Sequence, residues 1–563
     1  MTRALEAARA HRAVLAVLGG FALAAVVLPT MTPVALWDDW MYARSVEDLV
    51  LRGQLRIHEL SAANLLFQLL WSWPFAKLLG MTLGVLRLST VVLVGLSGWA
   101  LYGLLRELGV ERVPAALGTA LYLFNPLALV LTYSFMTDAQ FTALLVTAAY
   151  GYVRGLRGDA RAAWFTVAGS AAAGLAFLER QSGVFIVLAV LGHLLLSGKL
   201  RPDRRSLAVM ARVVGAPALL AIGYYAWLKT ATASAQPGVQ GAFTGGIAAA
   251  GWRGIALMVG RTWFVEAMYL GLFVAPLLVG AVTALPRAFR STTAGGRLAV
   301  LALTATLVAG FVLVLGWRGA AMPYAASWLT PRGPGPDDLV ASGRPVLLGS
   351  GTLMAITVLC ALSSVALILV LTRAVLPTGR PGPPPAVGLV LALLGGQMAA
   401  ALLPSFYFSG PLDRYLLPLL PLCLALALWA LRDLLDTPAA AWLATASLAV
   451  VALLGTHDFL RFEGAIWQVA REAHQQGVGY RQLDAGAAWT GYHAFERRGP
   501  RQPEAPWWIN AWARAVDSTY VVSGEPRPGY SVVRRQPYPS LLSVEPTSVY
   551  LLRRDDGTGR TPP

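Results

Sequence analysis

The sequence predicts an all-α polytopic membrane protein that carries a small external α/β domain at its C-terminus. Of its 563 residues, 56% are hydrophobic and only 13% are charged, and the mean hydropathy is +0.59. So few charges cannot cover a soluble globule of this size. Apolar stretches long enough to cross a hydrocarbon core of about 30 Å recur along most of the chain.

About thirteen of these stretches have the length and composition of transmembrane helices. We expect them at residues 14–34, 85–105, 113–132, 139–156, 162–178, 183–197, 207–228, 262–284, 298–316, 347–371, 386–404, 415–431 and 439–456. A further apolar stretch, residues 63–80, contains Trp71, Trp73, Pro74 and Lys77. This mixture favours a helix that lies at the membrane interface.

The distribution of basic residues predicts the orientation in the membrane. The net charge is +16, and groups such as Arg154, Arg157 and Arg161 stand in short loops that share one side if the N-terminus is cytoplasmic. The odd number of spans then places the C-terminus outside. No basic stripe interleaved with aromatic residues is present in the sequence, so a nucleic-acid partner is not expected.

Hydrophobicity ends near Gly455, which predicts two domains. Residues 1–456 form the transmembrane body, and residues 457–563, here called the C-terminal domain, form a soluble unit outside the membrane. Helical spacing is present at 465–475, whereas 518–523, 530–535 and 548–553 have the pattern of short strands.

Two adjacent carboxylates mark the end of the first span. The segment Trp37-Asp38-Asp39-Trp40 places them between indoles at the membrane edge, where a charge is retained mainly for chemistry, an ion or a polar ligand. Mutual repulsion makes one of them harder to ionise, which suits general-base catalysis. The alternative is a helix cap for the helix that follows.

Further polar residues are expected on the same external side as this pair. Asp138 precedes the fourth span, and Glu179 and Arg180 end the fifth. Asp138 has the alternative role of a helix cap, and Glu179 and Arg180 that of neutralising each other. Arg180 also has the planar guanidinium that matches phosphate.

Basic residues elsewhere have a functional and a structural interpretation. Arg56 and His58 lie on an amphipathic segment after the paired aspartates, where contact with lipid headgroups is the simpler explanation. Asp413-Arg414-Tyr415 precedes the twelfth span, either as a local ion pair or with Arg414 directed to the same phosphate. The sequence contains no diagnostic metal-ligand spacing, nucleophile elbow or phosphate-binding glycine loop.

The order of several short motifs resembles bacterial glycosyltransferases of the family 39 type. These enzymes have the GT-C fold and are related to lipid A aminoarabinose transferases and protein O-mannosyltransferases. The resemblance is carried by Trp37-Asp38-Asp39 with Tyr42-Ala43, Leu86-Arg87-Leu88-Ser89, Asn125-Pro126, Met136-Thr137-Asp138 and Arg414-Tyr415-Leu416-Leu417-Pro418. It covers residues 14–205 well and the rest mainly by layout.

The resemblance implies an inverting transfer at the external face of a bacterial inner membrane. The donor would be a sugar on a polyprenyl phosphate, and the acceptor a lipid, a glycan or a protein. Asp38 or Asp39 would act on the acceptor, Asp138 would be the second acid, and Arg414 with Tyr415 would meet the donor phosphate. No cofactor is required by the nearest relatives, although some branches bind a divalent cation between loop acids, which here would be Asp39 and Asp138.

One departure from the lipid A branch leaves the phosphate contact open. A lysine–proline pair of that branch is replaced here by the stretch His58 to Asn64, so Arg56, His58 and Arg180, together with Glu179, are the candidate binding residues. Two other classes of function also fit a polar cavity at the membrane edge. One is a transporter or flippase of lipid-linked sugars, and the other is a non-catalytic assembly protein.

Overall fold

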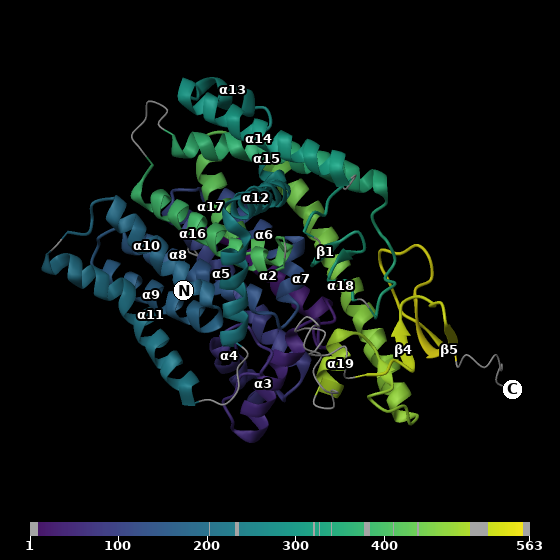
Figure 1. The fold of residues 1–563 in the computed structure, drawn as a ribbon. Helices are drawn as coiled ribbons and strands as arrows, with labels where there is room; N and C mark the ends of the chain where they lie inside the picture. Colours follow the sequence, from purple (N-terminus) through teal and green to yellow (C-terminus); the bar gives the residue numbers. More distant parts are fainter. Residues whose placement is uncertain are drawn as a thin grey trace.

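The protein is described here by a computed structural model. It covers residues 10–201, 203–230, 236–318, 321–325, 327–338, 340–376, 383–408, 410–435, 438–495 and 516–555. Helices form most of it, and a small sheet lies near the C-terminus (Figure 1). The predicted all-α class with a small strand-containing C-terminal part is therefore confirmed.

Every expected span coincides with a helix. These helices are α2 (Arg12–Val27), α5 (Leu83–Glu107), α6 (Arg112–Leu123) with α7 (Pro126–Thr132), α8 (Thr137–Gly155), α9 (Ala162–Glu179), α10 (Val184–Leu196), α11 (Arg204–Thr230), α12 (Gln236–Val279), α14 (Ala294–Arg318), α15 (Ser350–Val375), α16 (Pro385–Tyr407), α17 (Leu419–Leu431) and α18 (Pro438–Gln475). Within the described residues, eight helices are long and apolar enough to cross a membrane, or nine if α6 and α7 form one span. The chain is thus a multi-pass membrane protein, with fewer full-length spans than the thirteen predicted.

The difference from thirteen has local causes. The helices α2 and α17 are apolar but shorter than a full span, and α10 is short even with the 3-10 turn η1 (Gln181–Gly183) that precedes it. The helix α8 has 19 residues but carries Asp138, Gln140 and Arg154, and it is not among the eight. Between α6 and α7 the chain bends by 60°. Asn125 makes the new start possible, because its side chain accepts a hydrogen bond from the N–H of Leu127 at 3.0 Å and Pro126 occupies the first helical position.

The centre of the bundle contains helices that are apolar on all sides. Every residue of α7 is buried, and α17 buries all its residues except Ala430. By contrast, α14 exposes Leu298, Leu301 and Val312, as expected for a helix whose surface faces lipid. The site described below is therefore supported by the most deeply packed helices.

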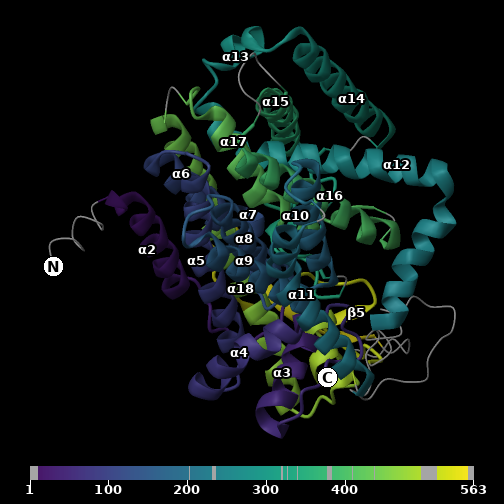
Figure 2. The same ribbon diagram turned by 90° about the vertical axis from the view of Figure 1, so that its left-hand side faces the viewer.

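Two short helices lie near one end of the bundle. These are α3 (Asp39–Arg52) and α4 (Leu66–Leu79), and α4 occupies the stretch expected at the interface. A third short helix, α13 (Leu285–Ser291), carries Arg287 and Arg290 at the opposite end from α3 (Figures 1 and 2).

The C-terminal part begins within a long helix rather than after it. The expected domain boundary at 456/457 lies inside α18, which also includes the helix expected at 465–475. After α18 come β3 (Leu483–Asp484), α19 (Ala487–Ala494), β4 (Tyr520–Ser523), β5 (Tyr530–Pro537) and β6 (Ser548–Arg554). The last three strands coincide with the three expected strands, and the sheet order is β3-β4-β6-β5, with β3 parallel to β4 and the other neighbours antiparallel.

Candidate functional site

Two acid–arginine pairs meet at one aromatic ring. The Asp38 Oδ2 atom lies 3.6 Å from Arg414 Nη1, and Asp138 forms an ion pair with Arg180. Both guanidinium groups lie over the ring of Tyr415, at 5.2 Å for Arg414 and 5.1 Å for Arg180. These five residues, here called the paired-charge cluster, bring together side chains that are far apart in the sequence.

Each member of the paired-charge cluster stands at the end of a helix. Asp38 directly precedes α3, Asp138 is in the first turn of α8, and Arg180 follows the last residue of α9. Arg414 and Tyr415 belong to the 3-10 turn η2 (Asp413–Leu416), which leads into α17. The helix ends bring these side chains together in a largely enclosed site, in which Asp138 and Arg414 are buried.

The capping alternatives for the aspartates are wrong. Asp38 occupies the N-cap of α3, but its side chain makes no capping hydrogen bond. The N-cap of α8 is Met136, so Asp138 lies inside the helix and pairs with Arg180. Both carboxylates are therefore directed at arginines from other elements, and not at their own helix starts.

Asp38 is accessible, whereas Asp39 is not. The Asp38 side chain is 32% exposed, and burial by surrounding protein raises the pKa of its carboxyl, an effect that Arg414 opposes. Asp39 is 2% exposed, and it accepts hydrogen bonds from the N–H groups of Leu36 at 2.5 Å and Phe135 at 3.1 Å. Burial raises the pKa of Asp39 to about 7, while these amides and the charge of Arg87 act in the opposite direction.

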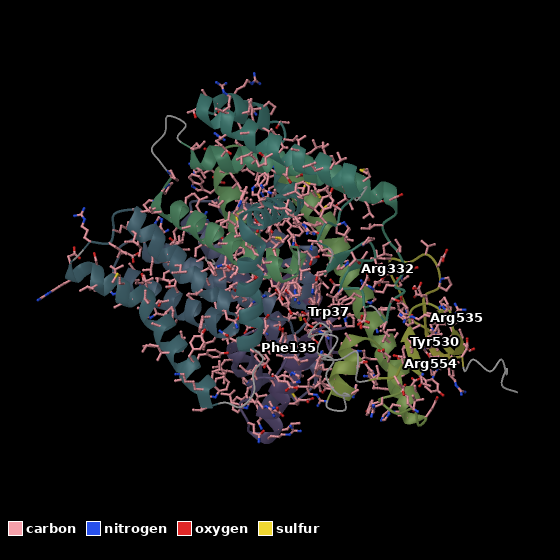
Figure 3. The ribbon with its side chains drawn as sticks, viewed as in Figure 1. Trp37, Phe135, Arg332, Tyr530, Arg535 and Arg554 are labelled. Carbon is pink, nitrogen blue, oxygen red and sulfur yellow. The ribbon has the colours of Figure 1, made fainter. Side chains whose placement is uncertain are left out.

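Asp39 thus fastens two loops to each other, and Arg87 fixes one of them. The guanidinium of Arg87 donates to the carbonyl oxygens of Thr30 at 2.7 Å, Thr32 at 3.2 Å and Val34 at 3.0 Å. Phe135 belongs to the loop just before Asp138. Figure 3 labels Trp37 and Phe135 beside each other, where these two loops meet.

Glu179 and Asp413 also have structural partners. Glu179 is fully buried, and its Oε2 atom accepts the N–H of Gln68 at 3.0 Å, while its neighbour Arg180 pairs with Asp138. Asp413 accepts the N–H groups of Trp328 at 2.9 Å and Leu329 at 2.7 Å. The charge of Arg180 acts on Glu179, but the ion pair of Arg180 is with Asp138. The carboxylate of Asp413 is directed to the amides of Trp328 and Leu329 and not to Arg414.

Tyr42 is a member of the site that sequence reasoning did not single out for a role. It lies one turn after Asp38 on α3, is 7% exposed, and is within electrostatic range of Asp38, Asp138, Arg180 and Arg414. Burial raises the pKa of its hydroxyl, which keeps it neutral and able to donate a hydrogen bond. Asp38 and Tyr42 are four residues apart, which places them on one face of a helix. This spacing is the feature of the sequence that could have indicated a role for Tyr42.

Arg56 and His58 are not brought into the paired-charge cluster. Arg56 is exposed, and the His58 ring packs against Trp40 at 5.0 Å and Phe495 at 4.9 Å. In the described part of the chain, no group of three or more His, Cys, Asp or Glu side chains is placed to hold a metal ion. The expectation of a divalent cation at Asp39 and Asp138 stays a prediction.

The C-terminal domain packs directly on the helix that follows Asp38. From α3, Arg44 donates to the Tyr492 carbonyl and lies 4.2 Å from the centre of the Tyr492 ring, and Glu47 accepts the Tyr492 hydroxyl. On the same helix, Trp40 lies against Gly491 and 5.4 Å from the Phe495 ring. The position of α3 therefore depends on α19.

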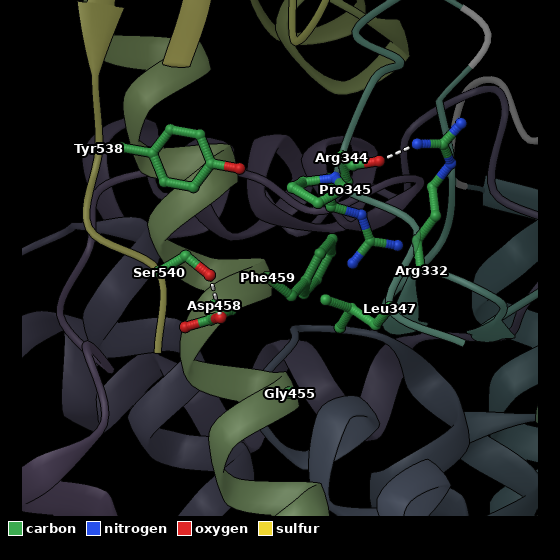
Figure 4. A pocket seen from close by; sticks show the side chains of 9 residues that line it. All are labelled: Arg332, Arg344, Pro345, Leu347, Gly455, Asp458, Phe459, Tyr538 and Ser540. Carbon is green, nitrogen blue, oxygen red and sulfur yellow. Dashed lines mark hydrogen bonds between the residues drawn. The ribbon is translucent and has the colours of Figure 1, made fainter. Parts of the chain in front are cut away.

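A small pocket lies elsewhere, where α18 meets the loop before α15 and the sheet (Figure 4). It is lined by Arg332, Arg344, Pro345, Leu347, Gly455, Asp458, Phe459, Tyr538 and Ser540. Asp458 accepts from Ser540 at 2.5 Å and from the N–H of Leu542 at 2.9 Å, and Arg332 donates to the Arg344 carbonyl. These polar groups have partners within the protein, so the pocket acts as a structural joint.

The fold and the paired-charge cluster describe a multi-pass membrane protein with acids and arginines gathered at helix ends. A family model described as dolichyl-phosphate-mannose-protein mannosyltransferase matches residues 68–227. Over this segment the match confirms the predicted relationship to protein O-mannosyltransferases. It includes Asp138, Glu179 and Arg180. No curated protein sequence matches the chain.

Several solved structures are similar in arrangement. ArnT from Cupriavidus metallidurans bound to undecaprenyl phosphate is 14% identical over 96% of this chain and 98% of its own, with a TM-score of 0.41. An Archaeoglobus fulgidus oligosaccharyltransferase is 15% identical over 89% of this chain and 63% of its own, with a TM-score of 0.45. The Saccharomyces cerevisiae Pmt1-Pmt2 complex is 16% identical over 38% of this chain, which spans 33% of the yeast chain, with a TM-score of 0.33. We base the relationship on the family-model match.

Proposed function

We propose that this protein transfers a sugar from a polyprenyl-phosphate donor to an acceptor at the external face of a bacterial inner membrane. The observation that carries the proposal is the position of Arg180 and Arg414 over one ring, each paired with an aspartate. Two guanidinium groups can share the oxygens of one phosphate, and charge-assisted contacts of this kind are strong. The family match and the helix-end location of the cluster support a lipid-linked donor.

The division of labour follows from exposure. Asp38 accepts the proton of an acceptor hydroxyl, whose oxygen attacks the anomeric carbon, and the bond from that carbon to the phosphate oxygen breaks. The electron pair stays with the departing polyprenyl phosphate, where Arg180 and Arg414 stabilise the charge. Attack opposite the leaving phosphate inverts the anomeric centre. Asp138 orients Arg180, and Tyr42 donates a hydrogen bond within the site.

The acceptor is a lipid, a glycan or a protein that presents a hydroxyl group. Asp38 is the acid of the site that is open to it, whereas Asp39 is enclosed and already accepts two backbone amides. The raised pKa of Asp38 suits a base that must take a proton near neutral pH.

The experiment uses the full chain in proteoliposomes with a panel of polyprenyl-phosphate sugars and a panel of lipid, glycan and peptide acceptors that carry a hydroxyl group, and it measures the release of polyprenyl phosphate. We expect turnover with at least one donor, and a loss of about 100-fold or more for Asp38→Asn. The control is Asp48→Asn on the same helix, where the native carboxylate pairs only with the exposed Arg52 at 2.6 Å. This control is expected to keep wild-type turnover.

The same vesicles test the transporter or flippase alternative. The bend between α6 and α7 and the interruption of α12 at Gly251 are broken helices of the kind that transporters use. A transporter would move a lipid-linked sugar across the bilayer without releasing polyprenyl phosphate. Movement that survives Asp38→Asn, with no release from any donor, would reject the transferase.

A further inference from the structure

Two buried side chains hold the backbone of Phe135, one through its N–H and the other through its carbonyl oxygen. Its N–H donates to Asp39 Oδ2 at 3.1 Å, and its carbonyl oxygen accepts from Gln68 Nε2 at 2.7 Å. Asp39 is 2% exposed and Gln68 is 0% exposed. Because both hydrogen bonds are shielded from water, losing either one would leave a buried polar group without a partner. Together they fix the position of the loop before Asp138.

The same glutamine is tied to the end of α9. Its backbone N–H donates to Glu179 Oε2 at 3.0 Å, and the N–H of Leu65 donates to the Glu179 carbonyl oxygen at 3.1 Å. A continuous path therefore runs from Asp39 through Phe135 and Gln68 to Glu179. It joins the start of α3, the loop before α8, the start of α4 and the end of α9.

Three residues of this buried path are close in sequence to three residues of the paired-charge cluster. Asp39 follows Asp38, Phe135 stands three residues before Asp138, and Glu179 precedes Arg180. In each of these three pairs, one residue belongs to the paired-charge cluster and the other belongs to the buried path. The relative positions of Asp38, Asp138 and Arg180 are thus set by contacts in the protein interior.

We propose that Gln68 is a positioning residue, which fixes Asp138 and Arg180 relative to Asp38 through its contacts with the backbone of Phe135 and with Glu179. The proposal rests on the proposed function. Gln68 is the central member because its side chain and its backbone bind two different segments of the site. A displacement of about 1 Å at a reacting group can reduce a rate by about 100-fold, so this single amide has a large effect on turnover.

Gln68→Met tests the proposal, because methionine preserves the length and flexibility of the side chain and removes the donor. The matched control is Gln140→Met. Gln140 is also 0% exposed, and it donates to Thr90 Oγ1 at 3.0 Å between α8 and α5, outside the path. We expect Gln68→Met to lower kcat at least tenfold with less than a threefold change in the donor KM, whereas Gln140→Met keeps kcat within twofold. The two thermal midpoints should fall by similar amounts.

A double variant separates positioning from general destabilisation. Gln68 and Asp39 hold the backbone of the same residue, Phe135, so Gln68→Met with Asp39→Asn should lose little more turnover than the worse single variant. Gln140→Met with Asp39→Asn should show the product of the two single losses. Equal kcat values for Gln68→Met and Gln140→Met, or a multiplied loss in the first pair, would overturn the proposal.

Hydrogen exchange keeps this test separate from that of the proposed function. In the folded protein, Gln68→Met should accelerate exchange in residues 133–138, and Gln140→Met should leave that segment unchanged. If the wild type turns over no donor, the proposed function fails, and the exchange result still decides whether Gln68 holds the segment. Unchanged exchange in Gln68→Met would overturn the positioning role by itself.

Discussion

The carboxylate of Asp38 lies 3.6 Å from the guanidinium of Arg414, although one residue follows the first helix of the bundle and the other precedes α17. Their contact joins the N-terminal part of the paired-charge cluster to the part near residue 414. Asp39, the adjacent residue, is directed to backbone amides instead. Two aspartates that look equivalent in sequence therefore have different chemistry.

The raised pKa of Asp39 predicts a pH-dependent stability. Its ordinary value is 3.8 and its folded value is about 7, so between these limits the folded protein keeps a proton that the unfolded chain loses. Raising the pH through this window therefore lowers the free energy of unfolding. We expect a higher thermal midpoint at pH 5 than at pH 8, and a smaller difference in Asp39→Asn, measured in one detergent.

Part of that pH dependence remains in the variant, because burial also raises the pKa of Asp413, to about 6. Asp48→Asn is the control, since that carboxylate forms an exposed ion pair with Arg52. The control should keep the full difference between pH 5 and pH 8. An Asp39→Asn protein with an unchanged difference would contradict the assignment.

Replacing Arg414 by lysine should weaken phosphate binding. Arg414→Lys keeps the charge but loses the planar group that lies over Tyr415 and faces Asp38. We expect the Kd for polyprenyl phosphate to rise about tenfold, which is about 1.4 kcal/mol. Calorimetric titration measures it, and Arg432→Lys is the control because Arg432 lies 4.7 Å from the Trp429 ring, outside the site. Equal Kd values for the two variants would refute a phosphate contact at Arg414.

Removing the charge of Arg87 should destabilise the loop that leads to Asp38. Arg87 is 1% exposed and donates to three carbonyl groups, so Arg87→Met leaves these acceptors without their donor and removes the positive charge that stabilises the Asp39 carboxylate. The expected loss is about 3–5 kcal/mol in the free energy of unfolding, because each buried acceptor left without a partner costs about 1–3 kcal/mol. Denaturant unfolding measures this loss, with the exposed Arg112→Met as control.

Arg87→Met combined with Asp39→Asn should lose less than the sum of the two single losses, because the second substitution removes the charge that the first leaves unpaired. Simple additivity would show that the two charges do not depend on each other.

Gly491→Ala should loosen the contact between α19 and α3. An added methyl group would collide with the indole of Trp40, which is buried and cannot move aside freely. We expect a loss of about 1–3 kcal/mol in stability and faster hydrogen exchange in α3. Gly479→Ala is the control, because its nearest neighbour would be Gln482 Oε1 at 3.5 Å. Unchanged exchange in α3 would show that α19 does not support it.

Hydrophobicity predicted where helices lie, because each span must satisfy its backbone internally in an apolar medium. It did not predict where helices stop or bend. The break at Asn125 has a local signal, an N-cap side chain followed by proline, which the continuous hydrophobicity of the surrounding stretch obscured. The continuation of α18 past the expected boundary was missed because its second half is amphipathic rather than apolar.

The members of the site were predicted better than their contacts. Asp38, Asp138, Arg180 and Arg414 are unusual as charges at span ends, so each drew attention separately. Gln68 did not stand out, since a neutral polar residue within an apolar stretch is common, and Tyr42 belonged to a motif of the family resemblance without a role of its own. The pairing of Asp38 with Arg414, and the separation of His58 from both, arise from packing between distant segments and have no local signal.

The length of α18 constrains how this protein can move. Its 38 residues correspond to about 57 Å at 1.5 Å per residue, well beyond a hydrocarbon core of about 30 Å. The same rod contacts α7 and α12 within the bundle and β4 and β6 beyond it. A hinge between the bundle and the sheet would have to bend this helix. We therefore expect the sheet and the bundle to move as one rigid body, and any opening of the site to come from the loops around α18.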